Sequence, residues 1–288
     1  MISIRPLLQP IRSAKSLYGR TNDHLSRSLA QRRMRKIGRG HREKCWCNGA
    51  LSTFKRHRGY GVCVNCSCYV NRNPPLPEEL RKFYSLERYW GKWMQLKGAP
   101  TIEARTANDL SDGRVAYWLS LIESYGPRSG EVIEVGCGPA VLLQELERRG
   151  YACTGIEVSE DVSDWIRKEK GLRIITGDFP NIHLPRCDIF LAFDVLEHIN
   201  DPCEFLREAK RLLRPGGVAI LQQPTIRPEW GYELDPPFGQ DFRRMFDDVE
   251  HLWIFTSTSL KLLAQNTGFQ VIDNNSRWRQ CHEILVLA

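Results

Sequence analysis

Short apolar runs alternate with amphipathic segments from residue 131 onward, and this alternation is the feature that most constrains the fold. It predicts strands at 131–135, 152–157, 173–176, 188–193 and 218–222, with helices at 140–149, 161–170 and 202–213 between them. Apolar strands separated by such helices indicate βαβ units in a parallel sheet covered on both faces. A helix at 257–267, capped by Ser257, precedes strands at 269–272 and 283–287. We expect an α/β fold with a doubly wound, mostly parallel, seven-stranded, Rossmann-like sheet.

The formal net charge of +7 is unevenly distributed. Residues 1–44 carry nine Arg and three Lys against Asp23 and Glu43, so this segment has a charge of +10 and the remainder −3. A solvated tail, a mitochondrial transit peptide and an RNA-binding arm all have this composition. No apolar core followed by a small-residue cleavage site indicates a secretory signal, and no apolar run is long enough to predict a membrane span.

The chain divides into four predicted parts. They are a basic, flexible arm at 1–44, a cysteine-rich module at 45–75, a helical linker or cap at 76–128 and the doubly wound domain at 129–288. Within the linker, an acidic first turn predicts an aromatic-rich helix from 76 to about 98, and a second helix is expected at 115–123.

Five of the ten cysteines lie close together in the cysteine-rich module. Two pairs, Cys45 with Cys47 and Cys63 with Cys66, are close to the paired-knuckle spacing of a tetrahedral Zn²⁺ site, although the first pair is one residue short of C-x-x-C. Cys68, His41 and His57 are alternative ligands. Scattered thiols elsewhere, without a secretory signal, indicate a reducing compartment. The module is therefore predicted to be a small zinc-ribbon-like unit, with free thiols as the main alternative.

A glycine turn joins the first strand of the doubly wound domain to its helix. Gly136 and Gly138 let backbone N–H groups approach a ligand, and Glu157, at the end of the next strand, is placed to accept hydrogen bonds from both ribose hydroxyls. The third glycine of a dinucleotide site is missing, because Val141 stands there. Glu134, just before the turn, suits an ammonium or sulfonium charge. The pattern indicates an adenosine-containing cofactor that is positively charged.

Five segments together resemble class I S-adenosylmethionine-dependent methyltransferases: EVGCGPA from Glu134, GIEVS from Gly155, GDF at 177–179, FDVLEHI at 193–199 and LLRPGG at 212–217. The resemblance implies that S-adenosylmethionine is the cofactor. Ala140 stands where the family usually has a third glycine. The residues implied to hold the cofactor are Glu134 and the backbone of Gly136, Cys137 and Gly138 around the methionine part, Glu157 at the ribose, Asp178 and Phe179 at the adenine, and Phe193.

The segment FDVLEHI provides candidate catalytic groups at the carboxyl end of its strand. Asp194 and His198 are candidates for a general base, and so is His251 in the later Glu-His-Leu segment. The Asp-x-x-Glu-His pattern resembles the motif of quinone-type O-methyltransferases, in which a related carboxylate–His set binds a metal. Structural roles, a catalytic base and a divalent metal site therefore remain open for these residues.

The cysteine module extends the likeness to bacterial sugar- and quinone-modifying methyltransferases, so the resemblance covers about 45–288. It implies methyl transfer to an O, N or C nucleophile of a small molecule or glycan. The alternative is an RNA methyltransferase or RNA-bound assembly factor positioned by residues 1–44 and the zinc module. The expected location is the cytoplasm, or the mitochondrion if residues 1–44 act as a transit peptide. The sequence does not determine the oligomeric state.

Overall fold

The structure is a computed structural model of the 288-residue chain, and it describes residues 37–288 except 56, 97–100, 227–245, 247–248 and 277–281. The described residues belong to one compact unit, Ile37–Ala288. Most of the predicted basic arm, residues 1–36, lies outside the described residues. The last residues of that segment contact the cysteine module, since Arg39 bridges to Pro75 and Lys44 to Ala50.

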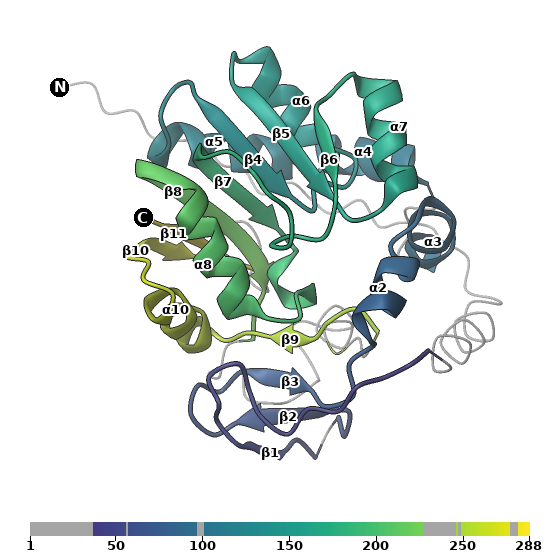
Figure 1. Cartoon of the computed structure of the whole chain (residues 1–288), viewed down its shortest axis with the longest axis vertical. Coiled ribbons are helices and arrows are strands. Elements are labelled where there is room, and N and C mark those ends of the chain that lie inside the picture. Colours follow the sequence, from purple (N-terminus) through teal and green to yellow (C-terminus); the bar gives the residue numbers. More distant parts are fainter. Residues whose placement is uncertain (1–36, 56, 97–100, 227–245, 247–248, 277–281) are drawn as a thin grey trace, which may run out of the picture. The chain divides into compact units, whose positions relative to one another are not determined.

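A seven-stranded sheet forms the centre of the fold (Figure 1). Its strand order is β10-β11-β8-β7-β4-β5-β6, and all neighbours from β8 to β6 are parallel. β11 is antiparallel to both β8 and β10. The predicted doubly wound, mostly parallel sheet is confirmed. Its strands are β4 (Glu131–Val135), β5 (Ala152–Glu157), β6 (Ile174–Thr176), β7 (Cys187–Phe193), β8 (Leu213–Pro224), β10 (Val271–Asn275) and β11 (His282–Leu287).

Alternate residues of the strands face two different helical layers, as the period of two requires. On one face, Ile133 and Phe190 belong to an apolar cluster with α8 (Pro202–Leu212) and α10 (Ser257–Asn266). On the other, Val132 and Ile189 join a cluster with α5 (Arg114–Tyr125), α6 (Val141–Arg148) and α7 (Glu160–Lys170). Both faces are therefore buried, which explains the near-continuous apolar runs of the sequence.

The cysteine module contributes to a second sheet. Its strands are β1 (Leu51–Thr53), β2 (Tyr60–Cys63) and β3 (Tyr69–Asn71), and β9 (Trp253–Ile254) from the far end of the chain pairs with β3. Figure 1 shows this small sheet below the seven-stranded one. The antiparallel β3–β9 pair therefore connects the module directly to the segment that follows His251.

The aromatic-rich segment is not the continuous helix predicted at 76–98. It forms α2 (Pro77–Phe83), the wide-turned helix η1 (Leu86–Trp93) and α3 (Met94–Leu96). Ser85 interrupts it, because its extended backbone (φ −135°, ψ 161°) starts a new helix and its hydroxyl accepts from the Arg88 N–H. Each piece then buries its own aromatic side chains, Phe83 in the first and Trp90 and Trp93 in the second.

Three further differences from the sequence prediction are local. The helix α4 (Ile102–Ser111) was not predicted, although Thr101 caps it through a hydrogen bond from the Ala104 N–H. The cap of α10 is Thr256 rather than Ser257, and Thr256 and Ser259 form a reciprocal capping box. β10 begins at Val271, two residues later than expected.

Between β7 and α8, Leu196–His198 forms the short helix η2. Among the described residues, no helix is both long and apolar enough to cross a membrane.

Candidate active site

One cavity of about 1190 Å³ lies at the carboxyl ends of the parallel strands, where doubly wound folds place their ligand sites. All eleven residues predicted to bind the cofactor or act in catalysis line it. They are Glu134, Gly136, Cys137, Gly138, Glu157, Asp178, Phe179, Phe193, Asp194, His198 and His251. The sequence therefore identified residues that the fold brings together from five separate segments.

Both glycines of the turn have a left-handed backbone conformation and leave little room for a Cβ. Gly136 has φ 66°, and a Cβ there would lie 2.6 Å from Val195 Cγ2. Gly138 has φ 49°, and its added Cβ would meet the Trp90 ring at 3.3 Å. Ala140, in the place of the family's third glycine, also adopts a left-handed conformation at φ 50° and is completely buried. The turn thus keeps its shape despite the alanine.

Glu134 is a buried carboxyl that lines the cavity, with 5% of its surface exposed. Burial raises its pKa to about 8, with a further contribution from Asp109. Its Oε2 atom has no hydrogen-bond partner among the described residues. A desolvated carboxyl of this kind gains most from a cationic ligand. Glu134 therefore fits the ammonium group of S-adenosylmethionine.

Glu157 ends β5 in a different environment. It is also buried, which raises its pKa to about 7, but backbone N–H groups of Ser159, Gly138 and Val158 oppose the shift. The Ser159 N–H donates to its Oε1 at 3.1 Å. These bonds hold the carboxyl in one orientation at the end of the strand, as a ribose-binding group requires.

The expected adenine residues lie beyond β6. Asp178 is half-exposed and pairs with Arg81 at 3.4 Å. Phe179 is buried, with its ring centroid 4.9 Å from that of Phe205 and 5.5 Å from that of Phe190, so it presents to the cavity a ring that is fixed by the core.

The histidines predicted as catalytic lie together. The rings of His198 and His251 have centroids 5.1 Å apart, and His198 Nε2 is 3.5 Å from Glu197 Oε1. One ligand atom from each of these three residues lies within 4.8 Å of the others, so the set could hold a divalent ion. His198 Nδ1 is 2.7 Å from the Glu250 carbonyl oxygen. Since a carbonyl only accepts, Nδ1 carries the proton and Nε2 has the lone pair, as in many metal-binding histidines.

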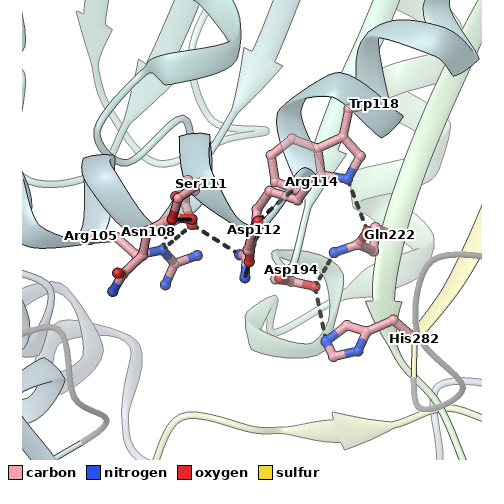
Figure 2. Close-up of polar contacts among 10 residues, drawn as sticks. Arg105, Asn108, Ser111, Asp112, Arg114, Trp118, Asp194, Gln222 and His282 are labelled. Atoms are coloured by element: carbon pink, nitrogen blue, oxygen red, sulfur yellow. Dashed lines mark hydrogen bonds and ion pairs between the residues drawn. The ribbon is translucent and has the colours of Figure 1, made fainter. Parts of the chain in front are cut away.

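Asp194 belongs to another cluster in the cavity wall. It has φ 56°, uncommon for a residue other than glycine, and its N–H donates to the Gln222 carbonyl at 2.7 Å. The Gln222 side-chain amide donates to its Oδ1 at 3.0 Å. Figure 2 shows Asp194 between Gln222 and His282, whose Nε2 lies 3.7 Å from Asp194 Oδ1.

Several cavity residues were not predicted as site residues. Arg105 Nε donates to both carboxylate oxygens of Asp109, at 2.7 and 2.9 Å, from the helix that the sequence did not reveal. His282 precedes the last predicted strand, and no motif marks it. The aromatic residues had been assigned only to a helix, but three of them border the cavity: Tyr84, Tyr89 and Trp90.

The four knuckle cysteines form a second cluster outside the cavity. Sulfur–sulfur separations are 3.6 Å for Cys45 and Cys66, and 3.5 Å for Cys47 with both Cys63 and Cys66. A tetrahedral ion with Zn–S bonds of about 2.3 Å has sulfurs about 3.8 Å apart, so the set fits Zn²⁺. Cys68 is outside this set, since its thiol donates to the carbonyls of Tyr69 and Ile254. His41 and His57 also lie outside it.

Comparison with known proteins gives similar proteins for most of the chain. The ubiquinone biosynthesis O-methyltransferase of Pseudomonas aeruginosa (strain LESB58) is 26% identical over 191 residues, which cover 60% of this chain and 78% of that protein. Its counterpart in Nitrosomonas europaea is 29% identical over 161 residues, 53% of this chain and 65% of that protein.

Solved structures show the same fold. A putative O-methyltransferase from Nostoc punctiforme matches with a TM-score of 0.53 at 14% identity, over 66% of this chain and 60% of that chain. A second match is a chain in the complex of the Haloferax volcanii Trm112 methyltransferase activator with a putative methyltransferase. Its TM-score is 0.50 at 16% identity, over 65% of this chain and 96% of that chain. A family model described as a methyltransferase domain matches residues 110–274, more than half of the sequence. The chain therefore belongs to the methyltransferase domain family and is an S-adenosylmethionine-dependent enzyme with the class I fold.

Proposed function

We propose that this enzyme transfers the methyl group of S-adenosylmethionine to a hydroxyl oxygen of a small aromatic molecule. The observation that carries the proposal is one cavity that joins the glycine turn and Glu157 to the acid–base groups Asp194, His198 and His251. The O-methyltransferase names of the relatives support oxygen as the acceptor atom. Aromatic side chains in the cavity wall support a flat, apolar acceptor: Tyr84, Tyr89 and Trp90.

The cofactor would lie over β4, β5 and β6. Glu134 would hold its ammonium group, and Arg105, whose guanidinium lines the same cavity, its carboxylate. Glu157 would accept from the ribose hydroxyls, and Asp178 and Phe179 would border the adenine. This order along the sheet directs the sulfonium methyl toward β7 and β8, where Asp194 lies.

Methyl transfer is an in-line displacement in which proximity and orientation account for much of the rate. An oxygen lone pair attacks the methyl carbon, the C–S bond breaks and its electrons remain on sulfur. The hydroxyl proton passes to a group at this end of the cavity, for which Asp194, His198 and His251 are the candidates. A divalent ion held by Glu197, His198 and His251 would, when bound, polarise the hydroxyl oxygen.

The cofactor assignment can be tested without knowing the acceptor. Titration calorimetry of the unsubstituted protein should show S-adenosylmethionine binding, and Glu157→Ala should abolish it, because the ribose hydroxyls lose their acceptor. Glu160→Ala is the matched control, since its side chain is 70% exposed on the next helix and does not line the cavity. Equal affinity in the Glu157 and Glu160 variants would contradict the proposed site.

The acceptor can then be identified by incubating the protein with labelled S-adenosylmethionine and cell extracts separated into small molecules, glycans, protein and RNA. Label in an aromatic small molecule is the expected result. The relatives favour this acceptor over RNA. The cytoplasm remains the proposed location, with the mitochondrion as the alternative.

We also propose that Cys45, Cys47, Cys63 and Cys66 bind a structural Zn²⁺ ion. The protein should contain one zinc ion per chain by elemental analysis, and Cys66→Ser should lose it together with thermal stability. Cys68→Ser is the matched control because Cys68 is equally buried yet bonds to carbonyls. Zinc content that is unchanged in the Cys66 variant would refute the assignment.

A further inference from the structure

His282 enters the cavity from the last strand of the sheet. β11 runs antiparallel to β8, with His282 opposite Pro224, so the first residue of β11 lies at the edge where β8 ends. The side chain is 20% exposed and lines the cavity. An imidazole thus lies at the carboxyl edge of the sheet, on the side of β7 that faces away from the proposed cofactor strands.

Its partner Asp194 is held by a chain of hydrogen bonds (Figure 2). Trp118 Nε1–H donates to Gln222 Oε1 at 2.9 Å, so the side-chain amide of Gln222 is oriented with its NH₂ group toward Asp194 Oδ1. Trp118 itself stacks on Phe193, with ring centroids 4.3 Å apart. The strained backbone of Asp194 is therefore fixed by buried groups, which is typical of residues with a functional role.

The charges around Asp194 keep it ionised. Burial raises its pKa, but the neighbouring His282, the hydrogen bond from Gln222 and the cations Arg114 and Arg105 together bring the pKa below its ordinary value. Arg114 and Arg105 are themselves paired with Asp109, and Arg114 also with Asp112. A carboxylate 3.7 Å from an imidazole nitrogen stabilises the protonated ring.

We propose that His282 is the catalytic residue that accepts the proton of the acceptor hydroxyl, with Asp194 as the positioning residue that stabilises the resulting imidazolium. The inference deepens the proposed function and rests on it. As the oxygen bonds to the methyl carbon, the C–S electron pair goes to sulfur and gives neutral S-adenosylhomocysteine. The O–H proton moves to the neutral imidazole of His282, and the imidazolium later releases it to water.

The other histidine cluster is less suited to this step. His198 Nδ1–H donates to the Glu250 carbonyl, and its Nε2 faces Glu197 in the set that could hold a metal ion. A nitrogen that ligates a metal has no lone pair left for a proton. His282 is outside that set, and its Nε2 lies 3.7 Å from the Asp194 carboxylate.

The pair can be tested by NMR titration of the histidine ring protons in the complex with S-adenosylhomocysteine. His282→Gln assigns the His282 resonance, and His183→Gln assigns the exposed His183, which does not line the cavity, as an internal control. In Asp194→Asn the titration midpoint of His282 should fall by at least one pH unit, a tenfold loss of proton affinity, while that of His183 stays constant. A midpoint of His282 that is the same in Asp194→Asn as in the unsubstituted protein would overturn the pairing.

The catalytic role of His282 is tested by activity measurements with catechol as the acceptor probe. This experiment does not depend on the Asp194 variant. At pH 7, His282→Gln should lower kcat by at least about 100-fold, as expected for loss of a general base, with the Kd for S-adenosylmethionine within about twofold. Near pH 10 a phenolic hydroxyl ionises without help, so the deficit should shrink below about tenfold. His183→Gln should behave as the unsubstituted enzyme.

A merely structural role would give the same deficit at both pH values, and that result would overturn the role of His282. The role of His282 would also be overturned if His282→Gln still bound the cofactor and its activity had the same pH profile as that of the unsubstituted enzyme. Failure of the unsubstituted protein to bind S-adenosylmethionine would instead overturn the proposed function, so the two failures are distinguishable.

Discussion

Glu134 makes the stability of the cofactor-free protein depend on pH in a way that can be calculated from the structure. Burial raises its pKa from 4.5 to about 8 in the folded state. A carboxyl whose folded pKa is raised contributes stability that is fully present below the unfolded pKa and is lost as the pH rises through the folded pKa. The protein without cofactor should therefore lose stability between pH 4.5 and 8 through this residue.

The magnitude follows from about 1.36 kcal/mol per pKa unit. At pH 7 the carboxyl is ionised in the unfolded state but mostly protonated in the folded state, which lowers the free energy of unfolding by ~3 kcal/mol. At pH 9 the carboxyl is ionised in both states, and the lowering approaches ~5 kcal/mol. At pH 5 the cost is under ~1 kcal/mol. Glu134→Gln removes the titration while keeping the shape of the side chain. The variant should be more stable than the unsubstituted protein by these amounts.

The assay is urea unfolding followed by tryptophan fluorescence at pH 5, 7 and 9. Glu131→Gln, at the half-buried start of the same strand, is the matched control for the loss of one carboxyl group. S-adenosylhomocysteine keeps the ammonium group. At saturation it should therefore raise the free energy of unfolding of the unsubstituted protein more than that of Glu134→Gln. Identical pH dependence in the Glu134 and Glu131 variants would refute the reasoning.

Three further substitutions test the same cavity. Gly136→Ala should lower the unfolding free energy by more than the ~1–2 kcal/mol of a left-handed alanine, because its Cβ also overlaps Val195, and should abolish cofactor binding by calorimetry. Ala140→Gly should raise the unfolding free energy measured in urea by under ~1 kcal/mol, since the chain entropy of glycine offsets part of the relief. Trp118→Phe should lower the unfolding free energy by ~1–3 kcal/mol, because the Gln222 side-chain oxygen loses its donor. It should also reduce kcat while the cofactor Kd stays constant. An unchanged kcat would contradict the role of this hydrogen-bond chain.

The zinc proposal has a consequence for the active site. Tyr60 Oη–H and the Asn71 side-chain amide both donate to the His251 carbonyl, at 2.7 and 3.3 Å. Both donors belong to the sheet that begins in the cysteine module. Loss of zinc in Cys66→Ser should therefore raise the KM for the acceptor while the Kd of S-adenosylmethionine, bound at β4–β6, stays within about twofold, about 0.4 kcal/mol. If the affinities for the acceptor and for S-adenosylmethionine both fell by similar factors, the module would support the whole domain rather than the acceptor side alone.

The sequence predicted the parts of the site that lie on consecutive elements. Gly136 and Asp194 each follow a predicted strand, and Glu157 ends one. Parallel strands bring their carboxyl ends to one edge, so strand order alone places these residues together. The knuckle cysteines were likewise predictable, because thiolates at short spacing have few other arrangements.

The remaining features depend on tertiary contacts. α4 is a polar helix whose Arg105 and Asp109 satisfy each other, and such a pattern does not differ from a solvated surface helix until the fold is known. His282 reaches the cavity only because β11 is antiparallel and in register with β8. The aromatic segment was predicted as one helix, since propensity does not reveal that Ser85 caps a new start.

The β3–β9 pair also sets the order in which the chain can fold. The Cys68 thiol donates to the carbonyl of Ile254, 186 residues later, and β9 completes the sheet begun by the cysteine module. Contacts of such long sequence separation form late, because the intervening loop must first be closed. During synthesis, the module therefore waits, with its third strand as an exposed edge, until most of the methyltransferase domain has left the ribosome. A zinc ion bound early by Cys45, Cys47, Cys63 and Cys66 would hold the end of β2 and the turn before β3 in place during that interval.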